Sequence, residues 1–282
     1  MDMVERYLEV KQDNLWNFLK LDGTLLSNLW FDNVWQFEEG FARVRLYGKG
    51  WNHINTEGKI ISDQWFDWEW NFQDGYAMVK LNEKWNFINK EGKLISDQWF
   101  DEAWDLKNGY ANVKLNDKYN FINTDGEIIS NQWFDKIFDF YHGFAVVKLN
   151  DKFNLINTKG ELLSKQWFDE VGYFPDSFAV VKLNGKENFI NTDGKIAFDQ
   201  WFDRVEDFQD GFAALEKEGS GYTFINTEGK RINDDWYNCV EAFYNGFSKV
   251  YKTEEDYYND KYYYLGTDGQ LYDCNKQLIK LK

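Results

Sequence analysis

The clearest pattern of hydrophobic and polar positions is a strict alternation in residues 109–116, GYANVKLN. Ala111, Val113 and Leu115 fall on one face of an extended chain, and the residues between them fall on the other. The next residues, DKYNFIN, form a second stretch of similar character. In a later copy of this pattern the junction reads Asn184-Gly185, a pair that strongly favours a two-residue hairpin turn. The pattern therefore predicts an antiparallel β-hairpin.

Two further segments complete the pattern. In NTDGEIIS, residues 123–130, Gly126 can supply a positive φ, which predicts a turn into a third short strand. The following NQWFDKIFDF, residues 131–140, predicts either a fourth strand or an irregular connector rich in aromatic residues. Together the segments predict a β-meander.

This meander pattern recurs at a nearly constant spacing. The Trp of the QWFD-like motif recurs in steps of 35, 34, 34, 34, 34 and 35 residues, at Trp30, Trp65, Trp99, Trp133, Trp167, Trp201 and Trp236. The turn Gly has the same steps, at Gly23, Gly58, Gly92, Gly126, Gly160, Gly194 and Gly229, with an eighth at Gly269. Because one unit is too small to bury its aromatic side chains alone, neighbouring units must pack together.

The repeat and the composition predict an all-β fold. One residue in five is Phe, Trp or Tyr, and there is a single Pro, which favours many short strands. We expect one repeat domain over residues 1–282, built as a tandem array of about seven 34-residue antiparallel β-meanders. Residues 1–22 are expected to form an N-terminal cap hairpin, and residues 247–282 a C-terminal cap hairpin and tail. A polar loop at 252–261 and eight hairpins around seven QWFD segments favour an open, superhelical or solenoid-like array; a closed seven-bladed β-propeller is the alternative.

The repeated columns resemble those of the WG-repeat family, which are bacterial β-repeat proteins. The resemblance extends over nearly the whole chain. The family's Trp matches Trp51 and Trp85, and its aromatic-Asp pair matches Phe100 and Asp101. Its Gly-x-Ala-x-Val pattern matches residues 109–113. The resemblance implies an interaction scaffold and implies no chemistry.

One departure from the family pattern concerns the Gly that follows the Trp. That position is Asn here, at Asn52, Asn86, Asn120, Asn154 and Asn188. Asn tolerates a left-handed backbone better than other non-Gly residues, so the exchange is consistent with a left-handed or bulged position. Alternatively, the Asn side chain caps a neighbouring backbone group.

A column of Asp residues follows the aromatic pair, at Asp32, Asp67, Asp101, Asp135, Asp169 and Asp203, with Asn238 in the seventh copy. A ladder of Ca²⁺ sites is one interpretation. Calcium loops need several oxygen ligands within about a dozen residues, however, and QWFDE lacks that spacing. We therefore favour a repeated turn in which Asp accepts backbone N–H bonds.

The sequence contains no constellation typical of an enzyme. His53 and His142 stand in different columns without a matched partner nearby, and we expect ordinary turn or surface residues. No nucleophile motif and no phosphate-binding Gly-rich loop is present. We predict no catalytic, metal-binding or cofactor-binding residue.

Two columns change character along the chain, and these are the candidate binding positions. The first aromatic column holds Trp35, Trp70, Trp104 and Phe138, followed by Gly172, Glu206 and Glu241. The second aromatic column holds Trp16, Trp51, Trp85, Tyr119 and Phe153, followed by Glu187 and Tyr222, and lies beside a row of Lys and Arg residues. Exposed rings among cations suit partner recognition. Alternatively, the rings pack on the next unit under the Lys side chains. The candidate partner-binding residues are Trp35, Trp70, Trp104, Phe138, Trp51, Trp85 and Tyr119.

Charge and hydropathy limit the kinds of partner and the cellular location that we expect. A formal net charge of −16 would repel phosphate backbones, so nucleic acid is not expected to bind. No apolar run approaches the roughly 20 residues that cross a bilayer, and no export signal is recognisable, so we expect no membrane insertion and a cytoplasmic location. Cys239 and Cys274 are expected to be reduced thiols. The sequence indicates no oligomeric state.

These observations favour a non-enzymatic scaffold that binds a protein or peptide through a repeated aromatic and acidic surface. A glycan-binding module that uses exposed Trp side chains as stacking platforms is one alternative. A structural component of a larger assembly, such as a virion or surface layer, is another.

Overall fold

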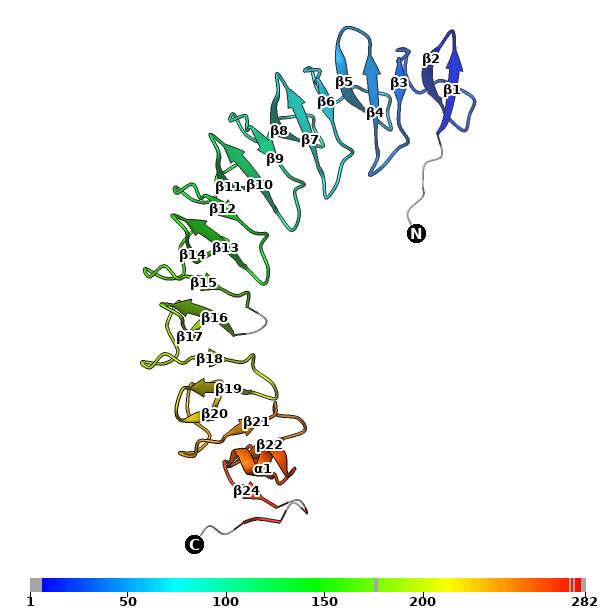
Figure 1. Ribbon diagram of the computed structural model, residues 1–282. Helices are drawn as coiled ribbons and strands as arrows, with labels where there is room; N and C mark the ends of the chain where they lie inside the picture. The colour runs from blue at the N-terminus through cyan, green and yellow to red at the C-terminus, as the bar shows by residue number, and fades with distance from the viewer. Residues whose placement is uncertain (1–6, 175–176, 274, 276, 280–282) are drawn as a thin grey trace. The chain divides into compact units, whose positions relative to one another are not determined.

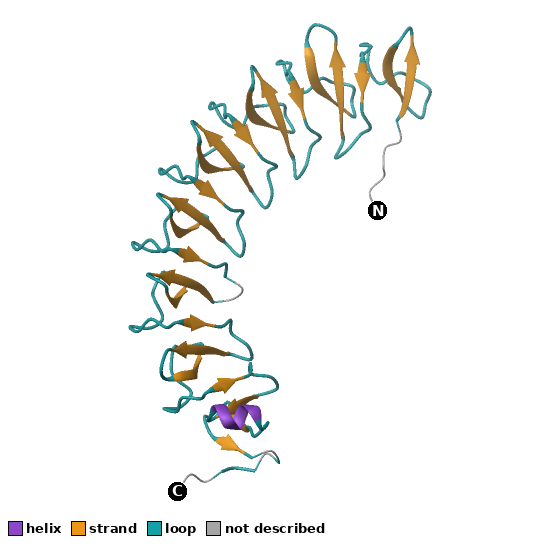
Figure 2. Ribbon diagram, in the orientation of Figure 1, coloured by secondary structure: helices purple, strands orange, loops and turns teal. Residues whose placement is uncertain are grey.

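The computed structural model describes residues 7–174, 177–273, 275 and 277–279. Strands are the main regular elements of these residues, and α1, Glu254–Tyr258, is the helix found among them (Figure 2). The chain divides into two compact units, residues 1–137 and 138–282. The single repeat domain expected over residues 1–282 stays a prediction. Parts of both expected caps, residues 1–6, 274, 276 and 280–282, lie outside the described residues, and Cys274 is among them.

The first unit contains a row of small antiparallel sheets, labelled in Figure 1. A two-stranded sheet pairs β1 with β2, and three-stranded sheets follow in the orders β3-β4-β5, β6-β7-β8 and β11-β10-β9. The strands are β1 (Leu8–Gln12), β2 (Leu15–Leu19), β3 (Asn33–Val34), β4 (Phe41–Leu46), β5 (Gly50–Asn55), β6 (Trp68–Glu69), β7 (Tyr76–Leu81), β8 (Lys84–Asn89), β9 (Glu102–Ala103), β10 (Tyr110–Leu115), β11 (Lys118–Asn123) and β12 (Lys136–Ile137).

The second unit repeats this plan. The hairpin β13-β14 is followed by sheets of order β15-β16-β17, β18-β19-β20 and β21-β22-β23-β24. The strands are β13 (Phe144–Leu149), β14 (Lys152–Asn157), β15 (Glu170–Val171), β16 (Phe178–Leu183), β17 (Lys186–Asn191), β18 (Arg204–Val205), β19 (Phe212–Lys217), β20 (Gly221–Asn226), β21 (Cys239–Val240), β22 (Phe247–Tyr251), β23 (Tyr263–Gly266) and β24 (Leu271–Tyr272). The helix α1 lies in the polar 252–261 loop, where no helix was predicted.

The all-β prediction of tandem antiparallel meanders is confirmed, and in the described residues no sheet closes into a barrel. The predicted hairpin alternation is present in β10, where Ala111 and Val113 are buried and their neighbours are half-buried. The predicted Asn-Gly turn joins β16 to β17, with φ of 52° at Asn184 and 78° at Gly185, as a type I′ turn requires. The hairpins are therefore set by local turn chemistry and a period of two.

The third strand lies elsewhere than predicted. The segment after Gly126 contributes only a bridge between Ile122 and Ile128. The paired residues instead follow the QWFD motif, as in β9, where Ala103 pairs with Val113 of the next hairpin. This is the place of the fourth strand that residues 131–140 offered as one alternative, and β12 lies there. A two-residue strand shows no alternation, so the pattern could not fix its bounds. Each QWFD segment thus joins the sheet of the hairpin that follows it.

Backbone contacts also link consecutive sheets. Trp85 of β8 and Phe100 exchange both N–H···O bonds, at 2.8 and 2.9 Å, so each QWFD segment also pairs with the hairpin before it. The Phe of the motif is fully buried, and its column is Phe31, Phe66, Phe100, Phe134, Phe168, Phe202 and Tyr237. The small-residue column is likewise buried, at Ala42, Ala77, Ala111, Ala145, Ala179, Ala213 and Ser248. The core therefore runs between successive sheets of each unit.

The turn Gly is required for two reasons. Gly126 has a φ of 81°, and a Cβ there would lie 1.6 Å from the carbonyl oxygen of Ile95 in the preceding repeat. Gly92 and Gly58 approach the preceding repeat in the same way, whereas Gly23 has nothing within 4 Å. The Gly column thus permits close contact between repeats.

The Asn column has a capping role, and the left-handed alternative is wrong. None of these Asn residues is among the described residues with positive φ. Asn120 is fully buried, and its Nδ2 donates to the carbonyl oxygens of Ser130 at 2.8 Å and Gln132 at 3.1 Å. Its Oδ1 accepts from the N–H of Phe121 at 2.8 Å. The same pair of donations recurs at Asn17, Asn52, Asn86, Asn154 and Asn188. Asn therefore satisfies the irregular backbone before each QWFD motif.

The Asp column caps hairpin turns, as the favoured interpretation predicts. Oδ2 of Asp101 accepts from the backbone N–H of Asn116 at 2.7 Å, and Oδ1 accepts from Nζ of Lys84. The bond from Lys84 and then that from Asn116 hold the pKa of Asp101 below its ordinary value. Asp203 forms the same pair of contacts with Lys186 and the N–H of Glu218.

Candidate binding site

The residues of the first aromatic column differ in exposure. Trp70 is 48% exposed and Trp104 is 41% exposed, whereas Trp35 and Phe138 are half-buried. Phe138 belongs to the second unit, where its ring centroid lies 6.5 Å from that of Tyr173. Two of the four predicted residues thus present large aromatic surfaces to solvent.

The second aromatic column is more enclosed. Trp51 is 6% exposed, and Trp85 and Tyr119 are half-buried. Nζ of Lys80 lies 5.4 Å from the ring centroid of Trp85, and Nζ of Lys114 lies 5.7 Å from that of Tyr119. These cations come from the directly paired positions of the neighbouring strand. The arrangement matches the alternative in which Lys side chains cover the rings.

The two columns meet between successive sheets of the first unit. The ring centroids of Trp35 and Trp51 are 4.7 Å apart, and those of Trp51 and Trp68 are 5.7 Å apart. Trp68, which is 42% exposed, also lies 6.5 Å from Trp70. We call Trp35, Trp51, Trp68 and Trp70 the tryptophan cluster. The sequence interpretation missed Trp68 because its column otherwise holds polar residues, except for Cys239.

Arg43 is held within the tryptophan cluster. Its guanidinium carbon lies 4.5 Å from the ring centroid of Trp35 and 5.9 Å from that of Trp51. Its Nη1 donates to the backbone carbonyl of Glu69 at 2.8 Å. Burial lowers the pKa of Arg43, while Glu69 opposes this shift. The space between two sheets can thus hold a guanidinium against aromatic rings and a backbone oxygen.

His53 and Glu69 form a buried pair beside this arginine. Nδ1 of His53 lies 3.2 Å from Oε2 of Glu69, with side-chain exposures of 1% and 0%. Burial raises the pKa of Glu69 above its ordinary value, and His53 opposes that shift. The expectation that His53 is a turn or surface residue is therefore wrong. His142 does lie in an exposed turn, with φ of 47°.

The repeat register contains the signal that would have revealed this pair. In the first seven hairpins His53 stands in a column that is otherwise apolar and buried: Phe18, Phe87, Phe121, Leu155, Phe189 and Phe224. Glu69 stands in a column of Val34, Ala103, Ile137, Val171, Val205 and Val240. Two polar substitutions in adjacent core columns of successive repeats indicate a contact between them.

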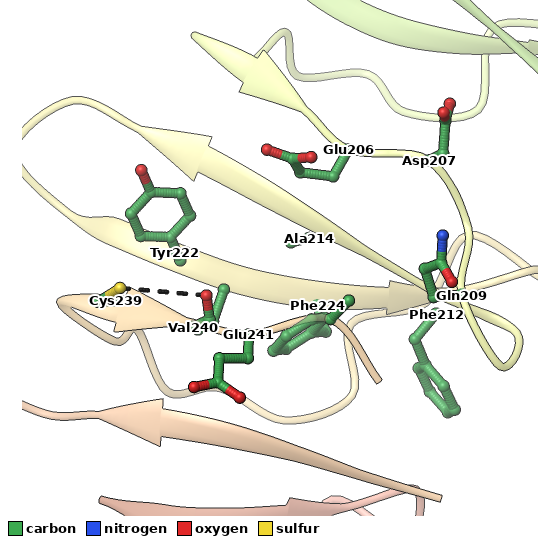
Figure 3. Close-up of a pocket in the computed structure, with 11 residues that line it drawn as sticks. Glu206, Asp207, Gln209, Phe212, Ala214, Tyr222, Phe224, Cys239, Val240 and Glu241 are labelled. Atoms are coloured by element: carbon green, nitrogen blue, oxygen red, sulfur yellow. Dashed lines mark hydrogen bonds between the residues drawn. The ribbon is translucent and has the colours of Figure 1, made fainter. Parts of the chain in front are cut away.

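The second unit has a cavity of about 350 Å³ between two successive sheets. Its walls come from β19, β20 and β21 and from the segments that follow β18 and β21 (Figure 3). Phe212, Ala214, Phe224 and Val240 supply apolar surface. The polar lining residues are Glu206, Asp207, Gln209, Tyr222, Cys239 and Glu241. The cavity combines an apolar floor with three carboxylates and was not predicted.

The cavity and the tryptophan cluster are equivalent places in the repeat, five repeats apart. Glu206 and Glu241 occupy the positions of Trp35 and Trp70 in the first aromatic column, and Tyr222 occupies that of Trp51. The remaining equivalent pairs are Arg43 and Ala214, His53 and Phe224, Trp68 and Cys239, and Glu69 and Val240. Ala214 and the two Glu residues replace the large side chains that fill the space in the first unit.

The described residues contain no group of three or more His, Cys, Asp or Glu side chains arranged to hold a metal ion. Cys239 is a free, half-buried thiol. In the described part of the chain, no helix is long and apolar enough to cross a membrane.

The fold and the columns define a tandem β-meander repeat protein. The family model described as WG containing repeat matches residues 20–49, 54–85, 87–119, 121–153, 155–186 and 189–220. The chain belongs to this family, and the resemblance expected from its motifs is confirmed.

Other comparisons give only distant similarity. No curated protein matches the chain. Among solved structures, the computationally designed Ika8 protein is 12% identical, with 93% of each chain covered and a TM-score of 0.30. BamB from Moraxella catarrhalis is 7% identical, covering 95% of this chain and 94% of that one, with a TM-score of 0.28. A eukaryotic initiation factor is 10% identical, with 98% of this chain and 87% of that chain covered and a TM-score of 0.36. These scores are too low to support an argument about fold or function.

Proposed function

We propose that this protein is a non-enzymatic scaffold that binds another protein or a peptide through its aromatic and acidic surface. The observation that supports the proposal is the exposure of three indoles in one unit, 42% at Trp68, 48% at Trp70 and 41% at Trp104. Large aromatic side chains are enriched among the residues that dominate binding energy at protein interfaces.

The fold does not require these indoles. Equivalent positions of the first aromatic column hold Gly172, Glu206 and Glu241 in later repeats, and those repeats form equivalent antiparallel sheets, the last with a fourth strand. Trp68 likewise corresponds to Glu102 and to Cys239. Exposed apolar area that packing does not need is typical of an interaction surface.

The proposal also covers the charge of the partner and the cellular location of the protein. The net charge of −16 favours partners with basic surfaces. A bacterial cytoplasmic location, expected from the sequence, is tested by cell fractionation with an antibody against the chain.

The direct test replaces exposed indoles and measures partner binding. A partner is first captured from the native host with the full chain and then purified. We expect Trp70→Ala with Trp104→Ala to weaken its affinity by at least about tenfold in calorimetry, since hot-spot truncations cost roughly 2 kcal/mol or more. Tyr47→Ala is the matched control, because Tyr47 is 89% exposed in the same unit and lies outside both aromatic columns. An unchanged affinity in a folded double variant would contradict the proposal.

A glycan-binding function is the second candidate, supported by the neighbouring rings of Trp68 and Trp70, 6.5 Å apart. Exposed indoles can stack on the apolar faces of sugars. Titration of the intrinsic Trp fluorescence with cell-wall and polysaccharide fragments separates the two candidates, since a protein-binding scaffold should give no saturable change. A structural role in an assembly would instead predict that the purified chain polymerises end to end.

A further inference from the structure

The repeat contains its own example of how the space between two sheets is filled. In the first unit the guanidinium of Arg43 packs on Trp35 and donates to the backbone oxygen of Glu69 at 2.8 Å. In the second unit the equivalent of Arg43 is Ala214, and a cavity of about 350 Å³ remains. The side chain that Ala214 lacks is therefore an arginine, which the same place in the first unit accommodates.

Two of the groups around the cavity correspond to groups that hold Arg43. Tyr222 stands where Trp51 lies beside the guanidinium, and Val240 stands where the backbone of Glu69 accepts its hydrogen bond. Two further replacements add charge, since Glu206 and Glu241 occupy the positions of Trp35 and Trp70. The cavity thus keeps an aromatic ring and gains two carboxylates, and the carbonyl oxygen of Val240, which lies 4.0 Å from Sγ of Cys239, stands at the place of the Glu69 oxygen (Figure 3).

We infer that this cavity binds the arginine side chain of a partner peptide, with the guanidinium between Glu206 and Glu241 and against the ring of Tyr222. The inference rests on the proposed function, and it names the chemistry of one contact. A volume of about 350 Å³ falls within the roughly 300–1,000 Å³ of ligand pockets.

The ion pairs that Glu206 and Glu241 already form are weak enough for a bound guanidinium to replace them. Glu206 pairs with Arg204 at 2.9 Å, and Glu241 lies 3.7 Å from Nζ of Lys249. The side chains of Arg204, Glu206 and Glu241 are 62%, 49% and 53% exposed, and pairs this exposed contribute little. A guanidinium within the cavity would be less hydrated, so its bonds to the same carboxylates would be stronger.

The geometry favours arginine over lysine. A planar guanidinium can stack on Tyr222 and donate to two carboxylates and a backbone oxygen at once, whereas an ammonium group is a compact and strongly hydrated charge. Burial raises the pKa of Tyr222, with Glu216 adding to the shift, so the phenol is neutral at pH 7. The ring therefore brings no charge of its own.

The first experiment uses N-acetyl-arginine amide as the probe, with the corresponding lysine and citrulline amides as comparisons. Citrulline keeps the shape of arginine without its charge. Cys239 lines the cavity, and in Cys274→Ser it is the only thiol in the chain, so its alkylation rate reports on occupancy. We expect the arginine probe to slow alkylation saturably and the citrulline probe to have no effect. Equal protection by the citrulline or the lysine probe, or none by arginine, would overturn the inference.

Variants then locate the contact. Glu206→Gln with Glu241→Gln should weaken binding of the arginine probe in calorimetry by about tenfold or more, because hydrogen bonds to charged groups are the stronger ones. Glu218→Gln with Glu228→Gln removes the same charge from exposed positions of this unit outside the cavity and should change the affinity less than twofold. Equal losses in the two double variants would mean that only the overall charge attracts the probe.

A third variant fills the cavity from within. Ala214→Arg copies the first unit and should abolish probe binding while the chain keeps its circular dichroism spectrum. Full affinity in folded Ala214→Arg would contradict the inference. Failure here would leave the proposed function standing, because that proposal is tested at Trp70 and Trp104 in the first unit. If Trp70→Ala with Trp104→Ala left the affinity for the partner unchanged, that result would instead contradict the proposed scaffold function. It would not contradict binding of arginine in the second unit.

Discussion

Nδ1 of His53 lies 3.2 Å from Oε2 of Glu69, and neither side chain is more than 1% exposed. The two residues come from β5 and β6, strands of successive sheets in the first unit. Apart from this contact, their polar side-chain atoms have no hydrogen-bond partner among the described residues. A polar contact thus replaces the apolar contact that other repeats make at this interface.

Replacing one member of this pair should reduce the stability of the fold more than replacing both members. His53→Phe restores the apolar column residue but leaves Glu69 buried without its partner, and we expect a loss of about 3 kcal/mol or more. His53→Phe with Glu69→Val restores both columns and should be neutral or stabilising by about 1–4 kcal/mol. Urea denaturation followed by Trp fluorescence measures both. A double variant less stable than His53→Phe alone would contradict this account of the pair.

The Gly column separates the effect of backbone conformation from that of close approach. Gly23 and Gly126 have φ of 82° and 81°, but only Gly126 faces the preceding repeat, at Ile95. Gly23→Ala should cost about 1–2 kcal/mol for its left-handed conformation. Gly126→Ala should cost about 1–3 kcal/mol more, because the two repeats must also separate. Thermal denaturation compares the variants, and equal losses would show that the contact between repeats contributes nothing.

The Asn column should tolerate Thr better than an apolar residue. Asn120→Leu leaves the carbonyls of Ser130 and Gln132 without their side-chain donor, at about 1–3 kcal/mol for each buried group. Thr223 occupies this column in a later repeat, where its hydroxyl donates to Asp235 O at 3.2 Å. Asn120→Thr should therefore lose less stability than Asn120→Leu. The order of their urea midpoints tests this, and a reversed order would rule out a capping role.

The Asp column should make stability depend on acidic pH. The bond from Lys186, and then that from Glu218, lower the pKa of Asp203 below 3.8. A lowered pKa in the folded chain stabilises it above pH 3.8, and this stabilisation is lost as the pH falls through the folded-state pKa. Asp203→Asn should therefore lower the melting temperature at pH 7, and its difference from the native chain should shrink below pH 3.8. Asp199→Asn, at an exposed position of the same unit, is the control. A difference that stays constant as the pH falls well below 3.8 would contradict the assignment.

Much of the fold could be predicted from the sequence because its signals are local and repeated. The alternation of Ala111 and Val113, the Asn184-Gly185 turn and the Gly column each depend on backbone conformation within a few residues. The turn-capping role of Asp101 was predicted for the same reason. Seven copies in register then reveal which positions are core.

The tertiary structure decided what depends on contacts between repeats. Two-residue strands such as β9 carry no periodic signal, so only the fold shows that they pair with the following hairpin. In the sequence His53 and Glu69 are polar residues of separate motifs. Only the packing of two sheets places Nδ1 of His53 3.2 Å from Oε2 of Glu69. The cavity is likewise lined by Ala214, Glu206 and Glu241 of successive repeats, which stand in place of larger side chains of the first unit. The sequence by itself determined the repeat and its turns, and packing between repeats decided where a ligand could enter.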